Sequence, residues 1–201
     1  MWEIIIAAGW PIWPLIFASI IALAIIVERF WALRTEVVTP SGLLSEIQKW
    51  TQQEGVINKE SLSKLEGHSL LGRIFSSALA NEKNSREVTK EAIEETGRAV
   101  AHNLEKYLST LGTIATVAPL LGLLGTVIGM VELFGAFTNS GHDVAQFARG
   151  ISIALYNTAA GIIVAVPAMI AYRYFRSKVD ALLIDMEQQA IKLVEILHGE
   201  R

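Results

Sequence analysis

The sequence predicts an all-α integral membrane protein with three transmembrane helices and long cytoplasmic helical extensions. Hydrophobic residues make up 52% of the 201 residues and charged residues 18%, and the mean hydropathy is +0.41. A soluble domain is usually about 25% charged. The charges also avoid three long stretches, and a helix of about 20 apolar residues crosses a hydrocarbon layer about 30 Å thick.

The first uncharged stretch predicts a transmembrane helix over residues 10–27, preceded by an N-terminal interfacial segment, residues 1–9. A buried core helix is the weaker alternative, because the stretch has no polar face. No Lys or Arg precedes Arg29, so the positive start of a cleavable signal peptide is missing, and we expect the stretch to stay in the chain. Three tryptophans gather at its start, as in the aromatic belt of a membrane interface: Trp2, Trp10 and Trp13.

Residues 28–107 change in character and predict a cytoplasmic helical domain. Acidic and basic residues are frequent there, and the segment contains no stretch that could span a membrane. The spacing of its apolar residues predicts short helices near residues 43–53, 58–67 and 69–81.

A further helix is expected to begin after Ser85, a good N-cap residue. No proline follows before Pro119, so we expect one helix that runs from water into the membrane without a break, as far as Phe137. The charged side chains near its start form either a solvated face or a contact between subunits: Glu87, Lys90, Glu91, Glu94, Glu95 and Arg98.

The other two transmembrane helices are predicted over residues 108–137 and 151–172, with a loop over residues 138–150 and a C-terminal helix over residues 173–201. Positive charge marks the cytoplasmic side of a membrane protein. The N-terminus and the loop are therefore expected outside, and the C-terminus inside. The charges that decide this are Arg29, Arg34, Arg98, Lys106, Arg173, Arg176 and Lys178.

Both of the last two spans carry small residues, which let helix backbones approach closely in lipid. Span two contains a Gly-x-x-x-Gly spacing, and span three has Ala154, Thr158, Gly161 and Ala165 on one face. Prolines inside the spans predict kinks that neighbouring helices must accommodate. We therefore expect a packed assembly, with Gly122, Gly125, Gly129, Ala154, Gly161 and Ala165 in the helix contacts and Pro119 and Pro167 at the kinks.

Thr126 and Thr158 lie at similar depth in these antiparallel spans, roughly 7.5 Å and 10.5 Å from their outer ends. We interpret them, with Asn157 alongside, as part of one polar, water-accessible surface. A hydroxyl bonded to its own helix carbonyl is the alternative for each threonine, and a plain hydrogen bond between helices is the alternative for Asn157. Glu132 borders span two at its outer end, either as a solvated interfacial residue or as a point of proton entry.

Several classes of function find no support in the sequence. The net charge of −3 gives no sign of nucleic-acid binding. There is no cysteine, the four histidines are scattered, and no metal or cofactor site is expected. No catalytic nucleophile with its base and no phosphate-binding loop is visible, so we do not expect an enzyme.

Residues 118–130, APLLGLLGTVIGM, and residues 150–168, GISIALYNTAAGIIVAVPA, resemble spans two and three of the ExbB/TolQ/MotA proton-channel family, with ExbB the nearest in size. The resemblance implies a bacterial inner-membrane protein with a periplasmic N-terminus and 138–150 loop and a cytoplasmic C-terminus. It implies a homo-oligomer of five copies around an ExbD- or TolR-like single-span partner. Proton flow would then drive motion that reaches a TonB- or TolA-like protein.

By the same resemblance, Thr126 and Thr158 border the proton route, and the partner carries the proton-accepting aspartate. One departure is Ile153, where many ExbB-like members carry a glutamate. Asn157 lies one turn deeper and keeps that face polar. Three functions stay open: a motor subunit for TonB-dependent outer-membrane transport, a TolQ-like subunit for envelope integrity, and a scaffold that does not conduct.

Overall fold

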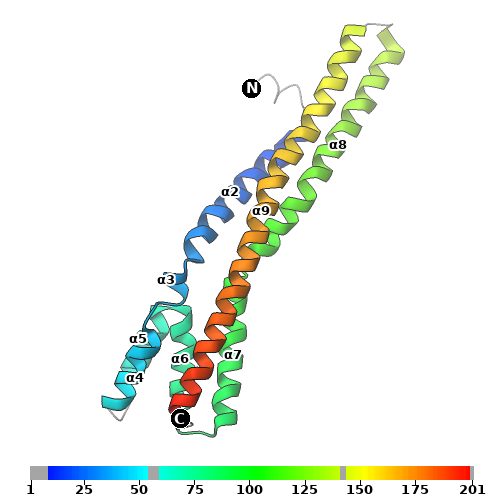
Figure 1. The fold of residues 1–201 in the computed structure, drawn as a ribbon. Helices are drawn as coiled ribbons and strands as arrows, with labels where there is room; N and C mark the ends of the chain where they lie inside the picture. Colours follow the sequence, from blue (N-terminus) through cyan, green and yellow to red (C-terminus); the bar gives the residue numbers. More distant parts are fainter. Residues whose placement is uncertain (1–8, 54–58, 141–143, 200–201) are drawn as a thin grey trace. The chain divides into compact units, whose positions relative to one another are not determined.

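The computed structural model describes residues 9–53, 59–140 and 144–199 (Figure 1). Every regular element in these ranges is an α-helix. The predicted interfacial segment lies almost wholly outside the described residues. Only the backbone is described for residues 50–53, 59, 136–140, 144–147, 149 and 153.

The three longest helices supply the segments that can cross a membrane. Helix α2 spans Ile12–Ala32, α8 spans Leu108–Ser140 and α9 spans Val144–Leu197. Among the described residues, three helical stretches are long and apolar enough to span: Ile12–Ala32, Arg86–Gly135 and Gly150–Leu197. The smaller helices are α3 (Thr35–Val38), α4 (Leu43–Gln53), α5 (Lys59–His68), α6 (Leu70–Ala80) and α7 (Arg86–Leu104).

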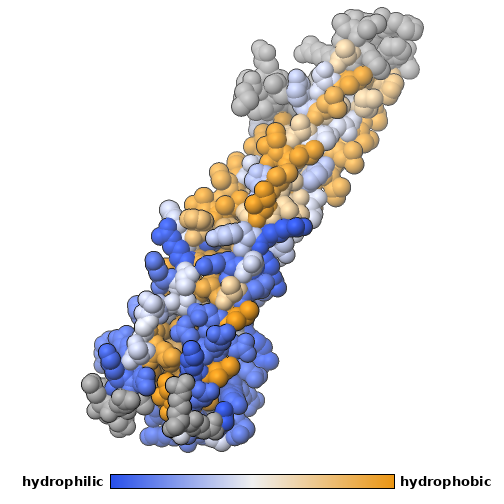
Figure 2. All heavy atoms as spheres, viewed as in Figure 1, coloured by the Kyte–Doolittle hydropathy of each residue, from blue (hydrophilic) through white to orange (hydrophobic). Residues whose placement is uncertain are grey.

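Contacts divide the chain into two units. The span unit comprises residues 1–28 and 107–174, and the polar unit comprises residues 29–106 and 175–201. The surface of the span unit is mostly hydrophobic in Figure 2, whereas that of the polar unit is mostly hydrophilic. This difference is expected if lipid surrounds the first unit and water the second.

The core of the span unit is built from small side chains and one leucine. Leu15 of α2, Ala118 of α8 and Ala165 of α9 are buried together, and Leu121, Ala160 and Val164 pack against them. The three helices therefore meet at one place within this unit.

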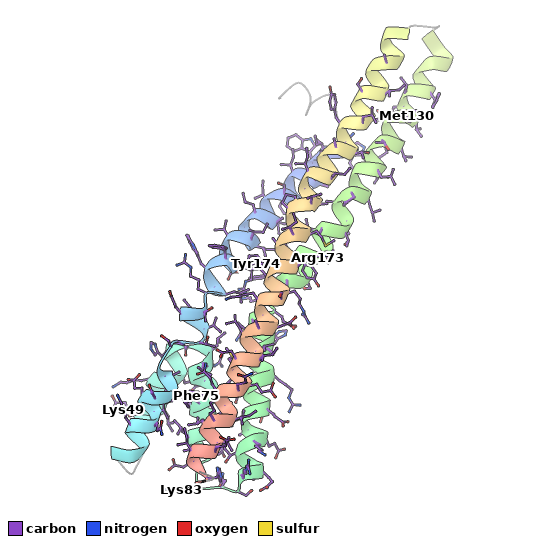
Figure 3. The ribbon with its side chains drawn as sticks, in the orientation of Figure 1. Lys49, Phe75, Lys83, Met130, Arg173 and Tyr174 are labelled. Carbon is purple, nitrogen blue, oxygen red and sulfur yellow. The ribbon has the colours of Figure 1, made fainter. Side chains whose placement is uncertain are left out.

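The core of the polar unit centres on α6, which packs against α5 and α7. Phe75 is fully buried there (Figure 3), and Leu71, Ile74 and Ala78 are buried beside it. The Ser69 hydroxyl caps α6 by accepting a hydrogen bond from the Gly72 N–H at 3.0 Å. The C-terminal part of α9 adds Val179, Leu182, Met186, Ala190 and Leu193 to the buried residues.

The expectation of one unbroken helix from Ser85 to Phe137 is wrong at Glu105–Tyr107. Ser85 does cap α7, but α7 ends at Leu104 and α8 begins at Leu108. Tyr107 has a φ of 64°, in the left-handed region that breaks a helix.

A tertiary contact explains where the break falls. Arg29 is 5% exposed, and its Nη1 donates hydrogen bonds to the carbonyl oxygens of Leu104 at 3.3 Å and Asn103 at 3.5 Å. In a continuous helix those carbonyls would accept from residues four positions further on. The guanidinium takes that place, and its positive charge suits a helix C-terminus.

The predicted loop over residues 138–150 is largely helical in the structure. Helix α8 runs to Ser140 and α9 begins at Val144, so the helices extend beyond the stretches chosen by hydropathy. Helices do not stop where apolar residues stop, because backbone hydrogen bonding continues into polar sequence. Helix α9 also continues the third span to Leu197 without a break, as expected for the C-terminal helix.

Candidate functional site

Helices α8 and α9 pack as an antiparallel pair along a seam of small residues within the span unit. Gly112 lies against Tyr172, Gly122 against Gly161, Gly125 against Asn157 and Gly129 against Ala154. Numbers rise on one helix as they fall on the other. We call this contact the α8–α9 seam.

The two backbones touch at the centre of the seam. A Cβ on Gly161 would lie 2.6 Å from the Ala118 carbonyl oxygen, and one on Gly122 would lie 2.7 Å from the Asn157 carbonyl oxygen. Both distances are too short for a real side-chain atom. Only glycine fits at these two positions, and such close approach maximises van der Waals contact between helices in lipid.

Asn157 lies inside this seam, 1% exposed. A Cβ on Gly125 would lie 2.7 Å from the Asn157 Cβ, so Gly125 provides the room for the asparagine. Of the two sequence interpretations, this placement favours a role in packing α8 against α9. A role in a proton route stays a prediction, and the side chain of Ile153, one turn away, is outside what is described.

Thr126 and Thr158 border the seam and are both half-buried. The Thr126 hydroxyl donates to the Leu123 carbonyl oxygen of its own helix at 2.7 Å. The alternative interpretation expected a hydroxyl bonded to a carbonyl of its own helix, and that is the arrangement found. The acceptor lies three residues back instead of the more usual four. A hydroxyl that donates in this way can still accept a hydrogen bond from water or a partner.

The two threonines lie on the same flank of the α8–α9 pair. Leu121 and Ala160 face the cluster around Leu15 of α2. Residues follow one another at about 100° around a helix, so Thr126 points about 140° away from Leu121, and Thr158 about 160° away from Ala160. We call the side that bears both hydroxyls the threonine flank; α2 covers the opposite side.

Glu132 does not join the threonine flank. It is exposed on α8 and points about 120° away from Thr126 around the helix. A role in proton entry therefore stays a prediction that nothing in this geometry supports. Pro119 and Pro167 lie inside α8 and α9, and kinks at them likewise stay predictions.

Sequence reasoning missed two participants in this packing. Ala118 and Leu15 are each 1% exposed at the meeting point of the three helices. Ala118 could have been found, because it continues the spacing of Gly122 and Gly125 by one turn. Leu15 could not, because nothing distinguishes it from the other aliphatic residues of its span.

The described residues contain no group of three acidic, histidine or cysteine side chains placed as metal ligands would be. What the fold defines is a multi-span helical membrane protein, with a tightly packed pair of spans that carries hydroxyls on one flank.

Comparison with known proteins assigns the chain to a family within this class. Residues 66–188 match the model of the MotA/TolQ/ExbB proton channel family. The chain belongs to this family.

Individual relatives agree with that assignment. Biopolymer transport protein exbB1 of Vibrio cholerae is 27% identical over 80% of this chain and 72% of its own length. Biopolymer transport protein ExbB of Pseudomonas putida is 30% identical over 90% of this chain and 57% of its own. Tol-Pal system protein TolQ of Haemophilus influenzae is 33% identical over 49% of this chain and 43% of its own.

Proposed function

We propose that this chain is an inner-membrane proton-channel subunit which, with an ExbD-like single-span partner, uses the proton-motive force to energise TonB-dependent outer-membrane transport. The observation that carries the proposal is the threonine flank. Two hydroxyls at similar depth lie on the side of the α8–α9 pair opposite α2, where a partner helix can reach them.

The chemistry of that flank indicates which of the two proteins carries the proton. Threonine does not titrate in the physiological range, so it can orient water or a partner's carboxylate but cannot carry a proton itself. The proton carrier then belongs to the partner, as an aspartate on its single span. Several copies of this chain, five by resemblance to the family, would surround that span.

The orientation in the membrane is part of the same proposal. Positive charge on one side of the spans supports a periplasmic N-terminus and a cytoplasmic C-terminus. The partner would pass force from the channel to a TonB-like protein.

A TolQ-like role in envelope integrity is the second candidate, because relatives named TolQ match about half of the chain. Relatives named ExbB match more of it, 80% and 90% for two of them, and support the first candidate. Deletion separates the two roles. Loss of iron-chelate or cobalamin uptake supports the first, and detergent sensitivity with intact uptake supports the second.

The direct test is proton flux into liposomes that contain this chain and its partner. Thr158→Val keeps the shape of the side chain and removes the hydroxyl, so we expect assembled complexes that conduct at least about tenfold less. Ser152→Ala is the matched control, because Ser152 is exposed on the same helix and its hydroxyl donates to the Ala148 carbonyl oxygen of that helix at 2.9 Å.

Wild-type flux from Thr158→Val would remove the assigned role of the threonine flank. Absence of flux from the wild-type complex with its partner would favour the third possibility, a scaffold that does not conduct.

A further inference from the structure

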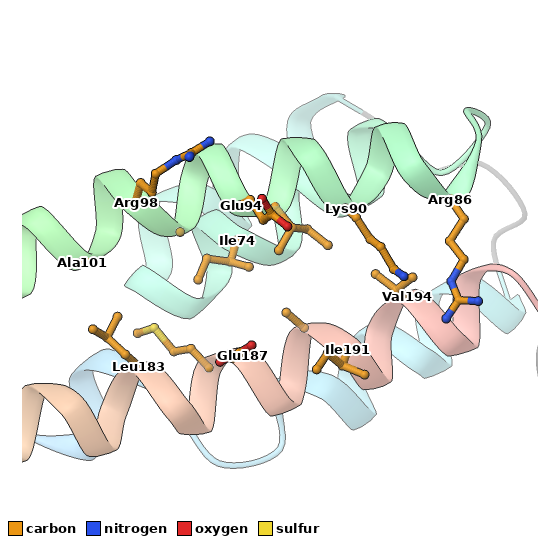
Figure 4. Close-up of a pocket in the computed structure, with 14 residues that line it drawn as sticks. Ile74, Arg86, Lys90, Glu94, Arg98, Ala101, Leu183, Glu187, Ile191 and Val194 are labelled. Carbon is orange, nitrogen blue, oxygen red and sulfur yellow. The ribbon is translucent and has the colours of Figure 1, made fainter.

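The described chain has surfaces that take no part in the proposed site. One is a groove in the polar unit between α7 and the C-terminal part of α9 (Figure 4). Lys90 and Arg98 line it together with Glu94 and Glu187, so its charge selects neither an acidic nor a basic ligand. Another is an exposed face of α8 in the span unit, where polar and apolar side chains follow one another in a definite order.

This face of α8 carries a row of exposed side chains at helical spacing: Ser109, Thr113, Thr116, Leu120 and Leu123. Positions i, i+4, i+7, i+11 and i+14 fall on one side of a helix. The first three side chains bear hydroxyls, and the next two are leucines that are 61% and 55% exposed. The face is therefore polar near the start of α8 and apolar further along it.

The polar part of this face gathers hydroxyls from both helices of the seam. Thr113 donates to the Ser109 carbonyl oxygen at 2.9 Å and Thr116 to the Gly112 carbonyl oxygen at 3.1 Å, and both hydroxyls can still accept from water. The ring of Tyr172 lies on Gly112, where a Cβ would be 3.4 Å from the Cζ that bears the phenol oxygen. We call Ser109, Thr113, Thr116 and Tyr172 the inner hydroxyl zone.

Apolar side chains separate this zone from the threonine flank. Thr116 and Thr126 are ten residues apart on α8, which is about 15 Å along the axis. Leu123 lies between them in height and in direction, since it points about 20° from Thr116 and about 60° from Thr126. On α9, Ile162 follows Thr158 by one turn in the direction of the inner zone, points about 40° from it and is 49% exposed. Both helices thus interrupt the polar surface at the same level.

We propose that Leu120, Leu123 and Ile162 form an apolar barrier between two water-accessible hydroxyl zones, so that a proton crosses only on the partner's carboxyl group. The inference rests on the proposed function and gives a role to residues which that function leaves out. Water leaves a narrow apolar constriction, so a chain of water molecules does not carry protons through the barrier. A charged carboxylate is costly to place there, whereas the protonated acid is neutral.

The two zones then serve the two halves of one proton transfer. The partner's carboxylate accepts a proton at the threonine flank, where water reaches it from the outer side. After the partner has moved, the carboxylic acid releases that proton to water in the inner hydroxyl zone, and the carboxylate is regenerated. Because the barrier prevents a continuous path through water, proton flow depends on movement of the partner.

Proton flux into liposomes tests the barrier. In a blocked complex, the intramembrane aspartate of the partner is replaced by asparagine, so protons pass only if they bypass the carboxyl group. Leu123→Ser should raise the flux of the blocked complex at least about tenfold, because a hydroxyl holds water in the constriction. If that variant does not assemble, Ile162→Thr, which keeps a branched side chain, carries the same expectation.

Leu124→Ser is the matched control for this experiment. Leu124 is 45% exposed and adjacent in sequence, but it points about 60° from Leu121, which faces the cluster around Leu15 of α2. The substitution therefore adds the same hydroxyl outside the proposed barrier. We expect no leak from it.

Cysteine labelling tests the inner hydroxyl zone without reference to conduction, because the chain contains no cysteine. A charged, membrane-impermeant thiol reagent, added to the full complex in liposomes from the side of the C-terminus, should modify Thr116→Cys. Val117→Cys is the control: Val117 is 39% exposed at the same level and points about 40° from Leu121, so it should stay unmodified. Leu123→Cys should also stay unmodified, because a thiol in apolar surroundings does not ionise to the reactive thiolate.

The outcomes separate this inference from the function on which it rests. A wild-type complex that conducts, together with no leak from Leu123→Ser in the blocked complex, overturns the barrier alone. An equal leak from Leu124→Ser, or equal labelling of Thr116→Cys and Val117→Cys, does the same. A wild-type complex without proton flux overturns the proposed function, and the inference with it.

Discussion

Gly122 of α8 and Gly161 of α9 meet backbone against backbone, so closely that a Cβ on Gly161 would lie 3.1 Å from the Gly122 Cα. No other pair of residue types permits this contact. It sets how closely the two spans that carry Thr126 and Thr158 approach each other. The permeation site proposed above therefore depends on two residues that carry no chemistry themselves.

Gly161→Ala should destabilise the folded chain by about 1–3 kcal/mol, because the new methyl group forces the helices apart at the Ala118 carbonyl. Gly135→Ala is the matched control within the same helix pair, since nothing lies within 4 Å of its Cβ position. That substitution should be neutral or stabilising by up to about 1 kcal/mol. Thermal unfolding in detergent measures the stability of both variants. Equal stability of the two would contradict the close backbone packing at Gly161.

Asn157→Ala should lower thermal stability and leave conduction by the remaining folded complexes close to wild type. The side chain is 1% exposed between α8 and α9, so its loss leaves a cavity beside Gly125. Flux per assembled complex separates packing from permeation. Normal stability together with lost proton flux would instead support a role of Asn157 in the proton route.

Arg29→Ala should cost about 1.5–3 kcal/mol, because hydrogen bonds from a charged donor to the carbonyls of Leu104 and Asn103 are lost. Arg29→Lys keeps the charge at the end of α7 and should recover part of the loss. Arg34→Ala serves as the control, since Arg34 is exposed. Denaturation measured in parallel for the three variants tests the order, and equal effects of the two alanine substitutions would remove the capping role.

Acid should loosen the start of α7. The backbone N–H of Glu87 and the Ser85 hydroxyl hold the pKa of the Glu87 carboxyl below its ordinary value, and Lys90 and Arg86 add to the effect. The ionised form is thus favoured in the folded helix. This stabilisation is complete above the ordinary carboxyl pKa and is lost as the pH falls through the lowered one.

Hydrogen exchange of the first turn of α7, corrected for the intrinsic rate at each pH, measures this loss. Protection should decline on acidification in the wild type. Glu87→Gln should show lower protection at neutral pH and little further decline. An unchanged profile in the variant would show that another group controls this end of the helix.

Much of the fold could be predicted from the sequence, because its signals are local. A run of uncharged residues specifies a membrane helix through the cost of burying charge in lipid. The N-caps Ser69 and Ser85 and the apolar spacing of α6 act within a few residues of themselves. The glycines of the seam could also be chosen, because small residues at helical spacing indicate close helix packing.

Only the tertiary structure decided where α7 ends, which interpretation of Asn157 its position favours, and which flank bears the threonines. Each depends on a residue far away in the chain: Arg29 reaches Leu104, Gly125 accommodates Asn157, and Leu15 covers the side opposite Thr126 and Thr158. Helical periodicity assigns each residue a direction around its own axis. Which neighbour occupies that direction is settled by packing three helices together.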